Sequence, residues 1–319
     1  GVEPGGCTKV CTAMALRTLV IASGVAVFTS AHQINLPINP SLGVPGFPDC
    51  VRQHPLSKLD IKQATDDLVC RQRDAPLDSI QIATVGDSIT AGVCSTGGNH
   101  TYPAQLQMLL DMKYSTGKYT VTNLGACGST MLKNGDSPFW KRPQFDALTK
   151  GTWDIVTIML GTNDAKDPGS HGPNNWRHDC GGPNAPTLSG CSFAENYAEM
   201  IKVVRGLGRT TAGPAIFALI PPPLMELNAY GMNQTVINRL YPKLVPLIAS
   251  ANNISGPIDI FASMGGAPPW SGQPSKPCGK DSSWKPCEWW CDQQSCDQCH
   301  PNNDGYAHLA PALLAGLGL

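Results

Sequence analysis

Residues 80–90, Ile-Gln-Ile-Ala-Thr-Val-Gly-Asp-Ser-Ile-Thr, predict a buried strand that ends in a turn. The first six residues are mostly apolar or β-branched, which favours a strand. Gly86 then interrupts the run, and Ser88 follows at the start of a predicted helix. We therefore expect Ser88 to lie at the carboxyl end of a strand, which is where open parallel sheets bind their ligands.

Beyond this segment, predicted strands and helices alternate along the chain. Further strands are expected at 118–124, 154–160, 215–220 and 256–261, and helices at 103–112, 195–207, 236–249 and 306–317. The strand over 154–160 is almost wholly apolar, as expected when helices cover both faces of a parallel sheet. The pattern predicts an α/β fold over residues 79–319: a three-layer α/β/α sandwich with a parallel sheet of about five strands.

Residues with catalytic chemistry follow several of these predicted strands. Gly128 comes after the second strand, Asn163 after the third, and Asp297 and His300 directly before the last helix. A serine hydroxyl is a poor nucleophile without an adjacent base, and His300 is the candidate base. Asp297 precedes it by three residues, so a single turn would bring its carboxylate to the imidazole.

Together these segments resemble the SGNH hydrolase (GDSL-like esterase) superfamily over roughly residues 80–317. Gly86-Asp87-Ser88 matches its first block, Gly128 the second, Gly161-x-Asn163-Asp164 the third and Asp297-x-x-His300 the fifth. The resemblance implies a flavodoxin-like sandwich and a triad of Ser88, His300 and Asp297. It also implies an oxyanion hole made by the Ser88 amide, the Gly128 amide and the Asn163 side chain, with no cofactor and no metal.

Each block taken alone has a structural interpretation. Ser88 and Asp87 are also favoured helix caps, and His300 could be a solvated loop residue. A second Gly-Asp-Ser tripeptide at 135–137 lacks a preceding apolar strand, which shows how little the tripeptide alone means. We expect Asp87 and Asp164 to be structural, because a carboxylate there would oppose the developing oxyanion. The chain contains no G-x-S-x-G elbow, which argues against the α/β-hydrolase fold.

Three further stretches, 139–145, 154–166 and 220–223, resemble the branch of carbohydrate or sialate O-acetylesterases. We therefore expect a secreted serine esterase that hydrolyses short acyl esters, chiefly acetyl, on carbohydrate or a small molecule. One alternative is a lysophospholipase-type lipid esterase that uses the same triad. The other is a secreted carbohydrate-binding protein without turnover. The formal net charge of −1, with no basic stripe, argues against nucleic acid as a partner, and we expect a monomer.

The N-terminal part of the chain has the features of a secretory leader. Residues 14–31 combine Arg17, an apolar run over 19–28 and a small-residue cleavage site, and this run is too short to span a bilayer. An ordinary buried helix is the alternative. We expect 1–13 to be an upstream or cloning-derived segment and 32–78 an N-terminal arm. Thirteen cysteines and sequons at Asn99, Asn233 and Asn253 agree with an extracellular glycoprotein.

The cysteines outside residues 1–31 number eleven, so one is expected to stay free or to pair between chains. Cys180 and Cys191 bracket a Gly- and Pro-rich loop and are expected to pair. We expect Cys127 to be the free thiol, and a Cys94–Cys127 disulfide is the alternative.

Residues 265–299, called here the Cys/Trp loop, hold five cysteines and four of the seven tryptophans directly before His300. We expect a disulfide-stapled loop that fixes the Asp297–His300 turn, and a zinc site is the alternative. Its tryptophans favour apolar packing over a sugar-stacking platform. Trp176 and His178, in a separate loop, are candidates to line the cleft.

Overall fold

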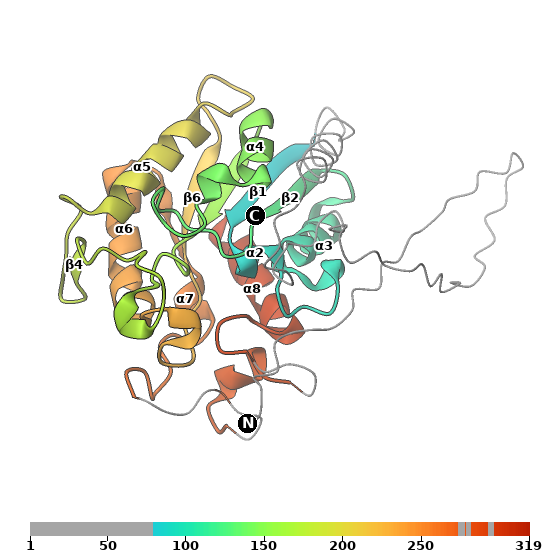
Figure 1. Ribbon diagram of the computed structural model, residues 1–319. Helices are drawn as coiled ribbons and strands as arrows, with labels where there is room; N and C mark the ends of the chain where they lie inside the picture. The colour runs from blue at the N-terminus through green and yellow to red at the C-terminus, as the bar shows by residue number, and fades with distance from the viewer. Residues whose placement is uncertain (1–78, 274–277, 279–281, 293–296) are drawn as a thin grey trace, which may run out of the picture.

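The computed structural model describes residues 79–273, 278, 282–292 and 297–319, and these form one layered α/β unit (Figure 1). The predicted leader, arm and upstream segment lie outside the described residues, as does part of the Cys/Trp loop.

The central sheet has five parallel strands, as the sequence predicts. They are β1 (Ile80–Gly86), β2 (Tyr119–Gly125), β3 (Ile155–Met159), β6 (Ala215–Ile220) and β7 (Ser255–Asp259), in the order β2-β1-β3-β6-β7. Gly86 at the end of β1 lies in register with Gly125 on one side and Met159 on the other. The order reverses direction at β1, so the carboxyl end of β1 lies at a switch point where such sheets bind ligands.

Helices cover both faces of this sheet and complete the three predicted layers. On one face, α4 (Pro143–Lys150), α5 (Ser192–Arg205) and α6 (Tyr241–Ala251) bury their apolar sides against the strands. On the other, α2 (Ser88–Ala91), α3 (Tyr102–Tyr114) and α8 (Asn303–Gly316) do the same, and α8 packs along α3. Among the described helices, none is long and apolar enough to cross a membrane.

The structure differs from the sequence-based expectation at several element ends. The strand expected over 256–261 ends at Asp259, because its carboxylate accepts a hydrogen bond from the Ala262 amide (2.8 Å) and starts α7 (Ile260–Ser263). The helix expected over 236–249 consists of a π-helical turn, Val236–Leu240, followed by α6. Unpredicted elements are α4, the hairpin β4 (Gly181–Gly182) and β5 (Ala185–Pro186), and 3-10 turns at Gly98–His100, Phe139–Lys141, Pro168–Ser170, Ala229–Gly231 and Lys285–Trp289.

The cysteines confirm one expectation and correct another. Cys180 is bonded to Cys191, as predicted. Cys127 is disulfide-bonded and is therefore not the free thiol that we expected, and Cys94 and Cys291 are bonded too. The free thiol in the described part of the chain is Cys299, which is buried 3.9 Å from the Met232 sulfur. The spacing of the cysteines along the chain could not show which one stays free, because disulfide pairing depends on which loops meet in the fold.

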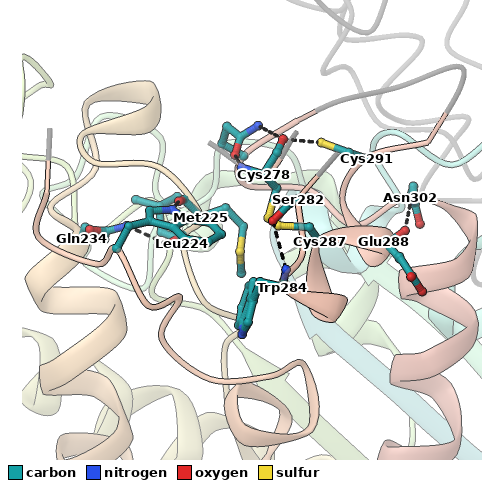
Figure 2. The surroundings of a disulfide bond; sticks show 12 residues. Leu224, Met225, Gln234, Cys278, Ser282, Trp284, Cys287, Glu288, Cys291 and Asn302 are labelled. Carbon is teal, nitrogen blue, oxygen red and sulfur yellow. Dashed lines mark hydrogen bonds between the residues drawn. A yellow bond between two sulfur atoms is a disulfide. The ribbon is translucent and has the colours of Figure 1, made fainter. Parts of the chain in front are cut away.

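The described part of the Cys/Trp loop is held by a disulfide between Cys278 and Cys287 (Figure 2). The two sulfurs are joined to each other, so neither is available as a zinc thiolate. Trp290 is fully buried, Trp284 packs edge-on against Trp270, and the Trp270 indole donates a hydrogen bond to the Met225 carbonyl (2.9 Å). These contacts are those of apolar packing under a loop.

Candidate active site

Ser88 is the first residue of α2 and lies directly beyond the end of β1. Asp87 caps this short helix, because its Oδ1 accepts a hydrogen bond from the Ile89 amide (2.9 Å). Ser88 is 8% exposed, and its Oγ lies 2.8 Å from His300 Nε2.

His300 and Asp297 form a compact turn just before α8. The Asp297 Oδ2 lies 3.0 Å from His300 Nδ1, while its Oδ1 accepts the backbone amides of Cys299 (2.8 Å) and His300 (3.1 Å). Burial would raise the pKa of Asp297, but the hydrogen bond and the positive charge of His300 outweigh it and lower the pKa to about 2. The carboxylate is therefore ionised at neutral pH, and it holds the imidazole with Nε2 facing Ser88.

The disulfide-bonded part of the Cys/Trp loop is hydrogen-bonded to this turn, as expected from the sequence. Gln298, between Asp297 and Cys299, accepts a hydrogen bond from the Cys278 amide through Oε1 (2.9 Å). Its backbone carbonyl accepts one from the Met225 amide (2.8 Å), just after β6. The turn that carries His300 is thus attached both to the disulfide-bonded loop and to the sheet.

Gly128 and Asn163 follow the two strands that flank β1. Asp164 connects their loops, because its carboxylate accepts the amides of Met131 (2.9 Å) and Leu132 (2.7 Å). Gly128 has a φ of +72°, a conformation that favours glycine, and a Cβ built there would meet nothing within 4 Å. The space beside the Gly128 Cα, at the sheet edge, is therefore open.

The Asn163 side chain carries a donor without an acceptor. Asn163 is 3% exposed, and its Nδ2 has no hydrogen-bond partner among the described residues. Such a buried, unpaired amide is costly, so each case calls for an explanation. An amide held ready for a substrate oxygen would account for it.

Asp87 and Asp164 are buried carboxyls with structural contacts. Burial raises the pKa of Asp87 to about 6, although the Ile89 amide and the charge of His300 oppose the rise. Burial raises the pKa of Asp164 to about 7, although the Leu132 and Met131 amides oppose the rise. Their hydrogen bonds to backbone amides agree with the structural role expected for both.

Two neighbours of Asp297 were not foreseen from the sequence. The Tyr230 hydroxyl donates a hydrogen bond to Asp297 Oδ2 (2.8 Å), and the Cys94 sulfur lies 3.4 Å from the same oxygen. Tyr230 belongs to a loop without hydrophobic periodicity, so the sequence carries no signal for it.

Trp176 does not line the cleft, contrary to the expectation. It is 2% exposed and packs against Phe193 and Tyr241 in the core. An indole has a large apolar area, and here the core buries nearly all of it. His178 is mostly exposed, and its Nε2 lies 3.3 Å from Asp167 Oδ2.

Cys94, Asp297 and His300 also bring one sulfur, one carboxylate and one ring nitrogen within 4.8 Å of one another. The Cys94 sulfur is in a disulfide, so it cannot bind a metal as a thiolate. The arrangement is instead suited to nucleophilic chemistry: a hydroxyl beside an imidazole, an imidazole beside an ionised carboxylate, and the Asn163 side-chain amide, which is unpaired among the described residues.

The chain is similar to known proteins over the part that holds these residues. The model of the GDSL-like lipase/acylhydrolase family matches residues 84–308, which include all five predicted site residues. An acetylxylan esterase of Xylanibacter ruminicola is 33% identical over 175 residues, which are 50% of this chain and 32% of that protein. The match thus spans about a third of that relative's length.

Among solved structures, one crystal structure with 18% identity has a TM-score of 0.51 and covers 76% of this chain and 97% of its own. Axe2, an acetylxylan esterase from Geobacillus stearothermophilus, has 19% identity and a TM-score of 0.48, with 76% and 96% coverage. The first of these likenesses shows the fold alone.

Proposed function

The chain belongs to the GDSL-like lipase/acylhydrolase family. We propose that it is a serine esterase that removes short acyl groups, chiefly acetyl, from a carbohydrate. The observation that carries the proposal is the pair of contacts Ser88 Oγ–His300 Nε2 (2.8 Å) and His300 Nδ1–Asp297 Oδ2 (3.0 Å). The sequence blocks around Ser88, Gly128, Asn163 and His300, which resemble the SGNH hydrolases, support the same conclusion, as does the similarity to an acetylxylan esterase.

In the proposed reaction, Ser88 Oγ attacks the ester carbonyl carbon while its proton passes to His300 Nε2. Asp297 stabilises the imidazolium and keeps the proton on Nδ1. The π electrons of the ester carbonyl move to the carbonyl oxygen. The resulting oxyanion accepts hydrogen bonds from the Ser88 and Gly128 amides and from Asn163 Nδ2.

Collapse of this intermediate breaks the bond to the alcohol oxygen, which takes the proton from His300. The acyl group is then an ester of Ser88. Water attacks that ester with His300 again as base, so acetate leaves and the Ser88 hydroxyl is restored.

The proposed substrate class rests on the relative that is 33% identical to this chain, an acetylxylan esterase. We therefore take acetylated xylan as the first polymer to test. A polyhydroxy acceptor also agrees with the stretches that resemble carbohydrate O-acetylesterases.

We propose that the protein acts outside the cell. The disulfides Cys180–Cys191 and Cys278–Cys287 support this, because such bonds persist in oxidising compartments. To test this, the protein would be expressed under oxidising and under reducing conditions, and its free thiols would be counted. We expect both disulfides to form only under oxidising conditions.

The test of function compares the wild type, Ser88→Ala and the control Ser189→Ala, since Ser189 is exposed in the loop before α5. We expect acetate release from acetylated xylan, and faster hydrolysis of p-nitrophenyl acetate than of the octanoate, with both lost only in Ser88→Ala. A preference for octanoate would favour the lipid esterase. Binding of xylan without turnover of any ester would favour the carbohydrate-binding protein.

A further inference from the structure

Tyr230 reaches the proposed triad from a different part of the fold. It lies in the turn Ala229–Gly231, after β6, and its hydroxyl donates to Asp297 Oδ2 at 2.8 Å. Its ring meets the His300 ring edge-on, with centroids 5.9 Å apart and planes at 65°. Tyr230 therefore touches both members of the proposed charge pair.

The backbone of this turn is held in an uncommon conformation. Tyr230 has a φ of +55°, in the left-handed region, which is unfavourable for a residue with a side chain. Such a conformation persists only where its surroundings determine it. Here the next residue, Gly231, packs against Gly172 so closely that a Cβ on Gly231 would lie 2.4 Å from the Gly172 Cα.

A neighbouring loop holds the turn in place. The Asp167 amide donates a hydrogen bond to the Gly231 carbonyl (3.1 Å). Asp167 also accepts a hydrogen bond through Oδ2 from Asn233 Nδ2 (2.7 Å). These bonds hold the turn at the residues that follow Tyr230, and so restrict the direction in which its side chain leaves the turn.

The Asp297 carboxylate is engaged at both oxygens. Oδ1 accepts two backbone amides, and Oδ2 faces both His300 Nδ1 and the Tyr230 hydroxyl. Although 58% of Tyr230 is exposed, its hydroxyl end lies against buried Asp297. Burial of that hydroxyl, followed by the charge of Asp297, raises the pKa of Tyr230 far above its usual value, so it remains a donor.

We propose that Tyr230 is a positioning residue, whose hydroxyl fixes Asp297 Oδ2 so that the carboxylate orients His300 toward Ser88. This inference rests on the proposed function. Because the hydroxyl shares the acceptor oxygen with His300, it also takes up part of the negative charge that would otherwise stabilise the imidazolium. Four further ionisable groups act on Asp297, His300 or Tyr230. They are Asp87, next to Ser88, Glu226, in the same loop as Tyr230, the buried Cys299 thiol and Tyr306 in α8.

Tyr230→Phe removes the hydroxyl and keeps the ring. We expect kcat for p-nitrophenyl acetate to fall about tenfold with little change in KM, which is the size of one hydrogen bond to a charged group. Without the Tyr230 hydroxyl, Asp297 Oδ2 would interact more strongly with His300 and would stabilise the protonated imidazole. The acid limb of the kcat/KM profile is therefore expected to shift to higher pH.

Tyr114→Phe, on α3, is the matched control, and thermal unfolding shows whether each variant is folded. Tyr230→Leu serves as a second variant and should show the same shift of the acid limb, because the hydroxyl alone causes it. An unchanged pH profile in both Tyr230 variants, with Ser88→Ala inactive, overturns this inference alone. Activity that survives in Ser88→Ala overturns the proposed function instead.

Discussion

Ser88 Oγ lies 2.8 Å from His300 Nε2, although 212 positions separate the two residues along the chain. The docking of α8 brings them together. The Tyr306 hydroxyl in α8 donates to the Val93 carbonyl (2.7 Å), and Asn303, at the start of α8, accepts from the Thr96 amide (3.0 Å). Val93 and Thr96 follow α2, so the same contacts that place α8 on the sheet also place His300 beside Ser88.

Asn163→Ala tests the proposed oxyanion donor. We expect kcat for p-nitrophenyl acetate to fall about 10²–10³-fold, the usual loss for one oxyanion-hole donor. The fold should survive, because Nδ2 has no acceptor among the described residues that the change would leave unpaired. Steady-state kinetics beside an Asn252→Ala control measure the effect, and a loss below about threefold would show that Asn163 does not act on the oxyanion.

Gly128→Ala and Gly125→Ala separate chemistry from folding. At Gly128 a Cβ meets nothing within 4 Å, so only the φ of +72° strains the chain, by roughly 1 kcal/mol. The methyl group would instead occupy the open space at the amide, and we expect a folded protein with activity reduced at least about tenfold.

At Gly125 a Cβ would lie 2.1 Å from the Ala91 amide nitrogen and 2.6 Å from the Thr90 carbonyl carbon. Gly125→Ala is therefore expected to lower the thermal midpoint or prevent folding. Circular dichroism melts and ester assays of both variants check this, and an active Gly128→Ala enzyme would speak against the proposed amide donor.

The buried carboxyls predict how stability depends on pH. The pKa of Asp87 is raised by burial to about 6, and that of Asp164 to about 7. A carboxyl with a raised folded-state pKa stabilises the fold fully below its unfolded value of about 4, and this contribution is lost as pH rises through the folded value. Asp297 has the opposite sign: its pKa is lowered to about 2, so its contribution is present above about pH 4 and lost as pH falls through about 2.

We therefore expect the free energy of unfolding in urea to decline between about pH 4 and pH 7. Asp87→Asn should reduce that decline, because the amide keeps an oxygen for the Ile89 amide and cannot ionise. The exposed Asp146→Asn is the control. A slope in Asp87→Asn equal to that of the wild type would show that Asp87 does not titrate in this range.

The sequence predicted all five strands of the sheet, because each is a short apolar or β-branched run ending at a turn residue. β6 was predicted with its observed limits, Ala215–Ile220. The predicted limits are wrong where a side chain that caps the backbone determines the end of an element. Asp259 is one such residue, because it caps α7 and so shortens the last strand. Helix α4 is only eight residues long, too short for its periodicity to be evident.

The residues proposed for the site follow strands or precede the last helix, and the resemblance of these blocks to the SGNH hydrolase superfamily selected them. The neighbours Tyr230 and Cys94 come from loops whose paths depend on tertiary contacts, and no local pattern marks them. The choice of Cys127 as the free thiol was wrong for the same reason: cysteine pairing is decided by which loops meet.

The central claim is that Ser88 is the nucleophile, and covalent labelling tests it most directly. A fluorophosphonate would be incubated with the wild type, His300→Ala and Ser189→Ala, with peptide mapping by mass spectrometry and esterase activity followed together. We expect a single adduct on Ser88 in the wild type and in Ser189→Ala, with activity lost in step with labelling, and little labelling in His300→Ala. Full labelling of Ser88 with activity retained, or an adduct on another residue that abolishes activity, would contradict it.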